Sequence, residues 1–304
     1  MTTLNVSATL PETPADTQAT SERRLSPSRL MVLRFCANRG AVAGLIIVLL
    51  FIAVSLLAPV IAPYDPLKQD YMAAFQGPSW AHWLGTDSFG RDMLTRILYG
   101  ARISFVVGFA SVSIAMVIGV AIGLAAGYYG GLVEAVLMRI VDGLLSFTPL
   151  VLAIALIAVL GLGLQNVILA LAATFAGMFA RVTRGDVLNI KGEPYVEAAQ
   201  LLGVGGAGVM FRHLLPNVLS PIIVQFGLNL AVAILLESGL SFLGLGVPPP
   251  EPDLGLMIAE GRGFIVMAPW ISGFPGLALV IIIVGLNLFG DGLRDALDPK
   301  AQIS

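Results

Sequence analysis

The sequence predicts an all-α polytopic membrane protein with about six transmembrane helices. Hydrophobic residues make up 57% of its 304 residues, charged residues make up only 12%, and the mean hydropathy is +0.90. Soluble domains carry about 25% charged residues. A helix needs about 20 apolar residues to cross the hydrocarbon core of a bilayer. Uncharged runs of at least that length occur at 41–62, 103–133, 143–180, 214–236 and 263–290.

The positions of the helices follow from these runs. The run 143–180 is too long for one helix, and Gly161 and Gly163 interrupt it, so we divide it there. Transmembrane helices are therefore expected at about 41–62, 103–127, 137–160, 165–182, 214–240 and 271–290.

The distribution of Lys and Arg sets the orientation. With both termini in the cytoplasm, twelve of the 17 basic residues fall on the inner side, as the positive-inside rule requires. We expect a cytoplasmic tail with an amphipathic elbow at 1–39, and then a first transmembrane helix at 40–62. The remaining divisions are a periplasmic segment at 63–100, a helical core at 101–291 with an inward loop at 183–213, and a cytoplasmic C-terminus at 292–304.

Several classes of function are disfavoured by composition. The net charge of −2 and the lack of a basic patch argue against a nucleic-acid partner. One cysteine, Cys36, and two distant histidines, His82 and His213, do not form a metal site. We therefore expect no metal, no bound cofactor and no catalytic residue on this chain.

The sequence also lacks a recognisable ATP-binding motif. None of its three lysines stands in the phosphate-binding pattern G-x-x-x-x-G-K-[ST], and neither H-E-x-x-H nor G-x-S-x-G occurs. An ATP-driven transporter would then need its ATPase on another chain. A secondary transporter or channel is the alternative, although we find no internal repeat of the kind that many secondary transporters carry.

The inward loop contains a short helix outside the membrane. Pro194 suits the first position of a helix, Glu197 lies in its first turn, and Gly203 suits its end. Such a helix can insert into a groove on a partner protein. One apolar face is expected to consist of Tyr195, Ala199 and Leu202.

The same loop resembles the EAA loop of ABC importer permeases. The shared pattern is Glu197-Ala198-Ala199, then Gly203, then Leu215-Pro216. The resemblance implies a coupling helix that docks in a cleft of a cytoplasmic ATPase, which uses ATP and Mg. The coupling residues that it implies are Tyr195, Glu197, Ala198, Ala199, Leu202, Gly203 and Pro216.

Other motifs resemble the dipeptide/oligopeptide/nickel permease family over about 34–300. They include Trp83-Leu84-Gly85-Thr86-Asp87, Leu240-Ser241-Phe242-Leu243-Gly244-Leu245-Gly246 and Asn287-Leu288-Phe289-Gly290-Asp291-Gly292-Leu293-Arg294-Asp295-Ala296-Leu297-Asp298-Pro299. The resemblance implies a type I ABC importer permease fold in the bacterial inner membrane. It implies a second homologous permease, one or two ATPases and a periplasmic or lipoprotein solute-binding protein as partners, besides membrane lipid. Dipeptides, oligopeptides, glutathione and nickel all remain open as solutes.

Glycine recurs every four residues in the second predicted helix. Gly119, Gly123 and Gly127 therefore share one smooth face, and bilayer helices approach closely where side chains are small. We expect this face to pack on a partner helix, either within the chain or across a subunit boundary.

Four polar residues at membrane depth are candidates for structural or functional roles. Arg139 and Asp142 are three apart and are expected to form a structural ion pair. Glu237 either faces a translocation path or satisfies backbone groups where the helix breaks at Gly239. Asn229 either lines that path or forms an interhelical hydrogen bond.

Overall fold

The computed structural model describes residue 33 and residues 35–297, and among these the regular elements are all helices. The predicted tail and elbow at 1–39 and the end of the C-terminal segment lie mostly outside the described residues. Five helical stretches are long and apolar enough to cross a membrane, and a bent pair of helices makes a sixth. The prediction of about six transmembrane helices is confirmed. The five stretches are α2 (Arg39–Ile61), α3 (Met93–Tyr129), α6 (Leu164–Ile190), the stretch Gly206–Phe242 that includes α9 (Leu215–Phe242), and α11 (Trp270–Leu297).

The bent pair replaces one predicted helix. α4 (Gly131–Leu145) and α5 (Pro149–Leu160) meet at an angle of 96°. Thr148 is extended because the residue before a proline is pushed out of the helical region, and Pro149 then begins α5. The prediction of one uninterrupted helix over 137–160 is therefore wrong.

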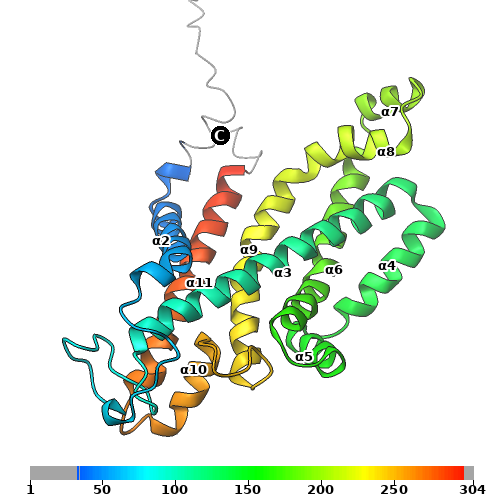
Figure 1. The fold of residues 1–304 in the computed structure, drawn as a ribbon. Coiled ribbons are helices and arrows are strands. Elements are labelled where there is room, and N and C mark those ends of the chain that lie inside the picture. Colours follow the sequence, from blue (N-terminus) through cyan, green and yellow to red (C-terminus); the bar gives the residue numbers. More distant parts are fainter. Residues whose placement is uncertain (1–32, 34, 298–304) are drawn as a thin grey trace, which may run out of the picture.

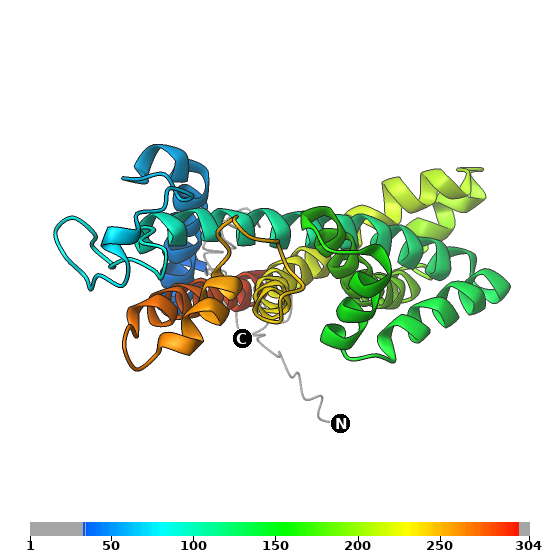
Figure 2. The ribbon, with the colours of Figure 1, turned by 60° about the horizontal axis from the view of Figure 1, so that its bottom comes forward.

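α3 runs along most of the length of the molecule (Figures 1 and 2). It packs against α6 and α9, while α11 packs against α2 and α9. The short helix α7 (Pro194–Leu201) lies at one end of this bundle and α10 (Leu254–Gly261) at the other. We call these the α7 end and the α10 end.

The glycine face of α3 packs on α6. A methyl group at Gly123 would lie 2.6 Å from both the carbonyl oxygen of Ala180 and the Cβ of Thr183. At Gly119 it would lie 2.4 Å from the carbonyl oxygen of Ala176. Gly127 is equally close to Val187 on the next turn. The predicted packing face is confirmed, and its partner is a helix of the same chain.

The two helices of this pair are longer than expected. α3 begins at Met93 rather than near 103, because the Asp92 carboxylate caps it by accepting hydrogen bonds from the N–H and hydroxyl of Thr95, at 2.8 and 2.7 Å. With 37 residues at 1.5 Å each, α3 is about 55 Å long and exceeds the hydrocarbon thickness of about 30 Å. α6 continues to Ile190 rather than ending near 182.

A buried network of charges organises the α10 end. The Asp87 carboxylate accepts a hydrogen bond from Nε of Arg91 and lies 3.6 Å from Nε of Arg96. Glu260 on α10 lies 3.4 Å from Arg91 and 3.7 Å from Arg96. Trp270 at the start of α11 donates a hydrogen bond of 3.1 Å to the carbonyl of Thr86. The segment 62–92 is thereby fixed to three helices.

The glycine face yields a stability prediction. Gly123→Ala places a methyl group against the backbone of α6, so α3 and α6 must separate, at a cost of about 1–3 kcal/mol. The midpoint of thermal unfolding, measured in detergent or lipid, should fall. Gly143→Ala is the matched control, because that helical position is exposed and the added methyl group meets nothing within 4 Å. Equal unfolding midpoints for the two variants would show that the close approach is unimportant.

Candidate functional site

The segment between α6 and α9 forms a separate lobe at the α7 end (Figure 1). It carries α7, then α8 (Gly206–Val209), then a π turn (Met210–Leu214). Because α6 continues to Ile190, the lobe covers 191–214 and is shorter than the loop predicted at 183–213.

The ends of α7 follow the sequence prediction. Pro194 occupies its first turn together with Glu197. Gly203 has a φ of +82°, its N–H donates to the carbonyl of Gln200 at 3.0 Å, and Val204 N–H donates to the carbonyl of Ala199 at 3.1 Å. These two bonds form a Schellman motif, which satisfies carbonyls at the end of the helix and favours glycine at this position. The predicted stop at Gly203 is confirmed.

One side of α7 is buried within the lobe. Val196 and Ala199 are buried, whereas Tyr195 is 44% exposed and Leu202 is 85% exposed. The expected apolar face is thus divided, because Ala199 is buried within the lobe while Tyr195 and Leu202 face solvent. The helix ends at Leu201, so Leu202 does not continue its periodicity, and Val196 pairs with Ala199 at a spacing of three instead.

The exposed side of α7 is partly apolar. Leu201 is 89% exposed and adjoins Leu202, while Glu197 and Ala198 are also exposed. This surface, formed by Glu197, Ala198, Leu201 and Leu202, is called the α7 surface below. Exposed apolar groups rimmed by polar ones mark interaction sites.

Tyr128 at the end of α3 joins the lobe to the transmembrane helices. The Lys191 ammonium donates a hydrogen bond to the Tyr128 carbonyl and lies 5.7 Å from the centre of its ring. On α8, a methyl group at Gly206 would lie 3.0 Å from the same ring. Tyr128 therefore contacts the lobe on both sides of α7 and links it to α3.

Pro216 lies where the lobe joins α9. In a regular α-helix its ring would clash with the carbonyl four residues earlier. The chain makes a π turn there, in which Leu215 N–H donates to the carbonyl of Met210. The helical path therefore continues from α8 into α9.

Glu237 and Asn229 lie inside the helix bundle. Glu237 is fully buried and accepts hydrogen bonds from the hydroxyls of Ser104 at 3.1 Å, Ser238 at 3.3 Å and Ser241 at 3.2 Å. α9 continues to Phe242, so the helix does not break at Gly239 and that explanation of Glu237 is wrong. Through Ser104, Glu237 connects α9 to α3.

The side chain of Asn229 forms its described hydrogen bond within its own helix and not to a neighbouring helix. Its Oδ1 accepts a hydrogen bond of 2.9 Å from Gln225, four residues earlier on α9. The expected interhelical bond is thus not found among the described residues.

The predicted pair of Arg139 and Asp142 does not form. Asp142 pairs instead with Arg181 on α6, at 2.7 Å. A second pair, Arg184 with Glu134, also links α6 to α4, with 2.6 Å between Arg184 Nε and Glu134 Oε1. A helical spacing of three permits an ion pair, but the neighbouring helix offers both carboxylates a partner, which the sequence alone does not reveal.

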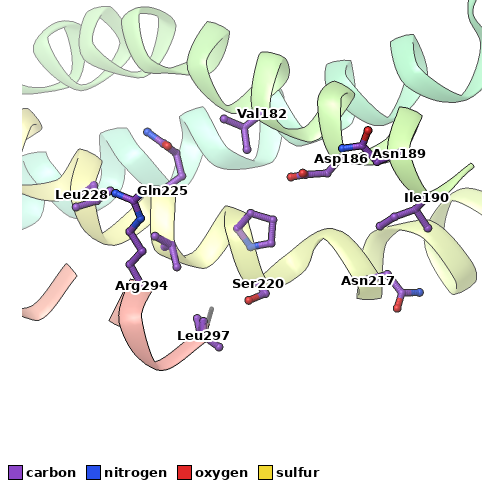
Figure 3. A pocket seen from close by; sticks show the side chains of 12 residues that line it. Val182, Asp186, Asn189, Ile190, Asn217, Ser220, Gln225, Leu228, Arg294 and Leu297 are labelled. Carbon is purple, nitrogen blue, oxygen red and sulfur yellow. The ribbon is translucent and has the colours of Figure 1, made fainter. Parts of the chain in front are cut away.

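A cavity of about 600 Å³ lies between α6, α9 and α11 (Figure 3). Its walls include Asp186 and Asn189 on α6, Gln225 on α9, and Arg294 on α11. These residues lie in the α7-end half of their helices, close to the lobe. Sequence analysis missed this cavity because the polar residues are far apart in the chain.

The described residues offer a docking surface and a cavity, and no group of three or more His, Cys, Asp or Glu among them can hold a metal. Residues 119–303 match the family described as binding-protein-dependent transport system inner membrane component. Residues 26–78 match the N-terminal transmembrane domain of oligopeptide transport permease C.

Similar proteins extend over nearly the whole chain. The dipeptide transport system permease of Alkalihalophilus pseudofirmus is 43% identical, over 91% of each chain. The glutathione transport system permease of Pectobacterium atrosepticum is 45% identical, over 91% of this chain and 92% of its own. The fold matches a chain of the inward-facing MetNI methionine ABC transporter with a TM-score of 0.53 and 21% identity, covering 68% of this chain and 98% of that one. The chain therefore belongs to the inner membrane components of binding-protein-dependent transport systems, the permease subunits of ABC importers.

Proposed function

We propose that this chain moves short peptides across the bacterial inner membrane, powered by ATP that separate subunits hydrolyse with Mg. The observation that carries the proposal is the α7 surface. Leu201 and Leu202 are 89% and 85% exposed on a helix that lies beyond the membrane-length helices. Burying them in a cleft of an ATPase removes apolar surface from water and favours docking.

The lobe is built to transmit movement. The buried side chains Val196 and Ala199 attach α7 to the rest of the lobe, and Tyr128 contacts the lobe at Lys191 and Gly206. ATP-driven closure of the ATPases would move α7 and, through it, α3, α6 and α9. Packed helices respond to such a displacement by moving as rigid bodies. The movement would favour one of two conformations of the translocation pathway over the other.

Short peptides are the solute class that fits best. The relatives cited above are named for dipeptide and glutathione transport, and their identities to this chain are nearly equal. A dipeptide and glutathione are both small peptides that carry an ammonium group and carboxylate groups. The partners that we propose are a second homologous permease, one or two ATPases at the α7 end, and a solute-binding protein at the α10 end.

The main test is whether peptide uptake requires ATP and the partner subunits. The chain should be reconstituted in lipid vesicles with its partners and with the loaded binding protein. We expect peptide uptake that requires ATP and an ATPase rate that the loaded binding protein raises. The chain alone should bind no ATP and transport nothing. Peptide uptake by the chain alone, driven by a proton or sodium gradient, would show a secondary transporter instead.

Orientation is tested by labelling single cysteines. The exposed native Cys36 is first replaced by serine. In that background Met72→Cys, which is 93% exposed, and Glu251→Cys should react from outside intact cells with a membrane-impermeant maleimide. Gln200→Cys should react only after the membrane is opened, because the positive-inside bias puts the α7 end in the cytoplasm. External labelling at Gln200 would contradict docking to a cytoplasmic ATPase.

Docking is tested on the α7 surface itself. Leu202→Asp places a charge that must be desolvated in the cleft, so uptake should fall by more than about tenfold, the effect of losing an interface hot spot. The fold should persist, because this side chain is already in contact with solvent. Leu202→Met, which keeps an apolar side chain of similar volume, is the matched control and should retain most uptake. Equal uptake by both variants would place the docking site elsewhere.

A further inference from the structure

The cavity between α6, α9 and α11 has the size and polarity of a small-molecule site. Its volume of about 600 Å³ falls in the usual range for such sites, roughly 300–1,000 Å³. Apolar side chains such as Val182, Val224 and Leu228 line part of it, and polar ones line the rest. Sites of this composition bind ligands by apolar contact and orient them with a few polar groups.

Two opposite charges border the cavity from different helices. Figure 3 shows the Asp186 carboxylate on α6 and the Arg294 guanidinium on α11 reaching from facing walls. The two groups are not joined by an ion pair. Oδ2 of Asp186 is buried and has no hydrogen-bond partner among the described residues. Buried carboxylate oxygens are rarely left without a donor, and Asp186 as a whole is only partly buried, so its carboxylate is available to a donor that enters the cavity.

Amide side chains add acceptors to the walls of the cavity. The NH₂ group of Asn217 donates to the carbonyl of His213 at 2.6 Å, and that of Gln225 donates to Asn229 at 2.9 Å. Both bonds lie within or next to α9, and they leave the amide oxygens of Asn217 and Gln225 as acceptors. Such acceptors suit the N–H groups of a peptide bond or an ammonium group.

We propose that this cavity is a binding site for short zwitterionic peptides on the α7 side of the pathway. Asp186 binds the terminal ammonium group, and Arg294 binds the terminal carboxylate with its planar guanidinium. The apolar wall accepts different side chains without selecting among them. The inference rests on the proposed function, which it deepens by naming the residues that hold the solute.

The position of the site connects binding to the lobe. α6 ends at Ile190, just before the lobe, and α9 begins at Leu215, just after it. Two of the three walls therefore move when α7 moves, and the distance between Asp186 and Arg294 changes with them. A site whose charges separate during the ATPase cycle releases a zwitterion that it had bound.

Thiol protection tests binding directly. Ser220→Cys, in the Cys36→Ser background, places a thiol in the wall of the cavity. The assembled, nucleotide-free importer in lipid is treated with a maleimide, and alkylation at position 220 is followed by mass spectrometry. Dialanine should slow alkylation, and dialanine with an acetylated amino end and an amidated carboxyl end should not. Equal effects of the two peptides, or no effect of either, would overturn the proposal.

Uptake tests the two charges separately. Asp186→Asn and Arg294→Gln should each lower ATP-driven dialanine uptake by at least about tenfold, because each removes a charge-assisted hydrogen bond. The ATPase rate stimulated by the loaded binding protein should stay near normal, because the α7 surface is unchanged. Asp142→Asn is the matched control, since its carboxylate pairs with Arg181 at an exposed position, where ion pairs contribute little.

The outcomes separate this inference from the proposed function. A parallel loss of uptake and stimulated ATPase in Asp186→Asn would indicate a structural role and overturn the proposal, as would normal uptake in both variants. Absence of ATP-driven uptake with the unmodified importer would instead contradict the proposed function. In that case the protection experiment still decides whether the cavity binds zwitterionic peptides.

Discussion

The close approach of α3 and α6 is the constraint on which the arrangement depends. Three glycines allow the helices to approach closely, with Gly119 and Gly123 facing carbonyl oxygens and side-chain Cβ atoms of α6. No larger residue fits there, because a packed backbone has no rotamer that can yield to an added side chain. α3 reaches both ends of the bundle, so this contact positions the lobe at one end relative to the charge network at the other. In a lipid bilayer the hydrophobic effect contributes little to helix association. Close packing is therefore the main interaction that holds α3 and α6 together.

The two ends are held by different interactions. At the α10 end, Asp87, Arg91, Arg96 and Glu260 join the segment 62–92 to α3 and α10 through several mutually dependent contacts. At the α7 end, the described ion pairs are single links between α4 and α6, and the lobe contacts the bundle through Tyr128 and Lys191. A network of buried charges resists displacement, because moving one member leaves the others without a partner. The charge network therefore ties the α10 end together more firmly than the single ion pairs tie the α7 end.

The sequence predicted what local chemistry determines. The apolar runs located the membrane helices, and Pro194 and Gly203 predicted the two ends of α7. The four-residue glycine repeat predicted the packing face of α3. Two local signals were available but not used. Asp92 with Thr95 is a capping pair that extends α3, and Pro149 divides the helix predicted over 137–160. Arg181, the partner of Asp142, and Ser104, the interhelical partner of Glu237, belong to helices distant in sequence, so no local pattern could identify them.

The cavity shows why functional residues were the hardest to predict. Asp186, Gln225 and Arg294 come from three helices, and each in isolation resembles an ordinary polar residue near a membrane surface. These residues line one cavity because the glycine face of α3 fixes the position of α6 and because α11 packs against α9. Once α6 and α11 are placed, the chain has a carboxylate and a guanidinium on facing walls without a bond between them. Asp186 is partly buried and Arg294 is exposed, so both charges stay available to a third species that enters the cavity. A zwitterion joins them without adding net charge, and this property distinguishes short peptides from simple ions as occupants of the cavity.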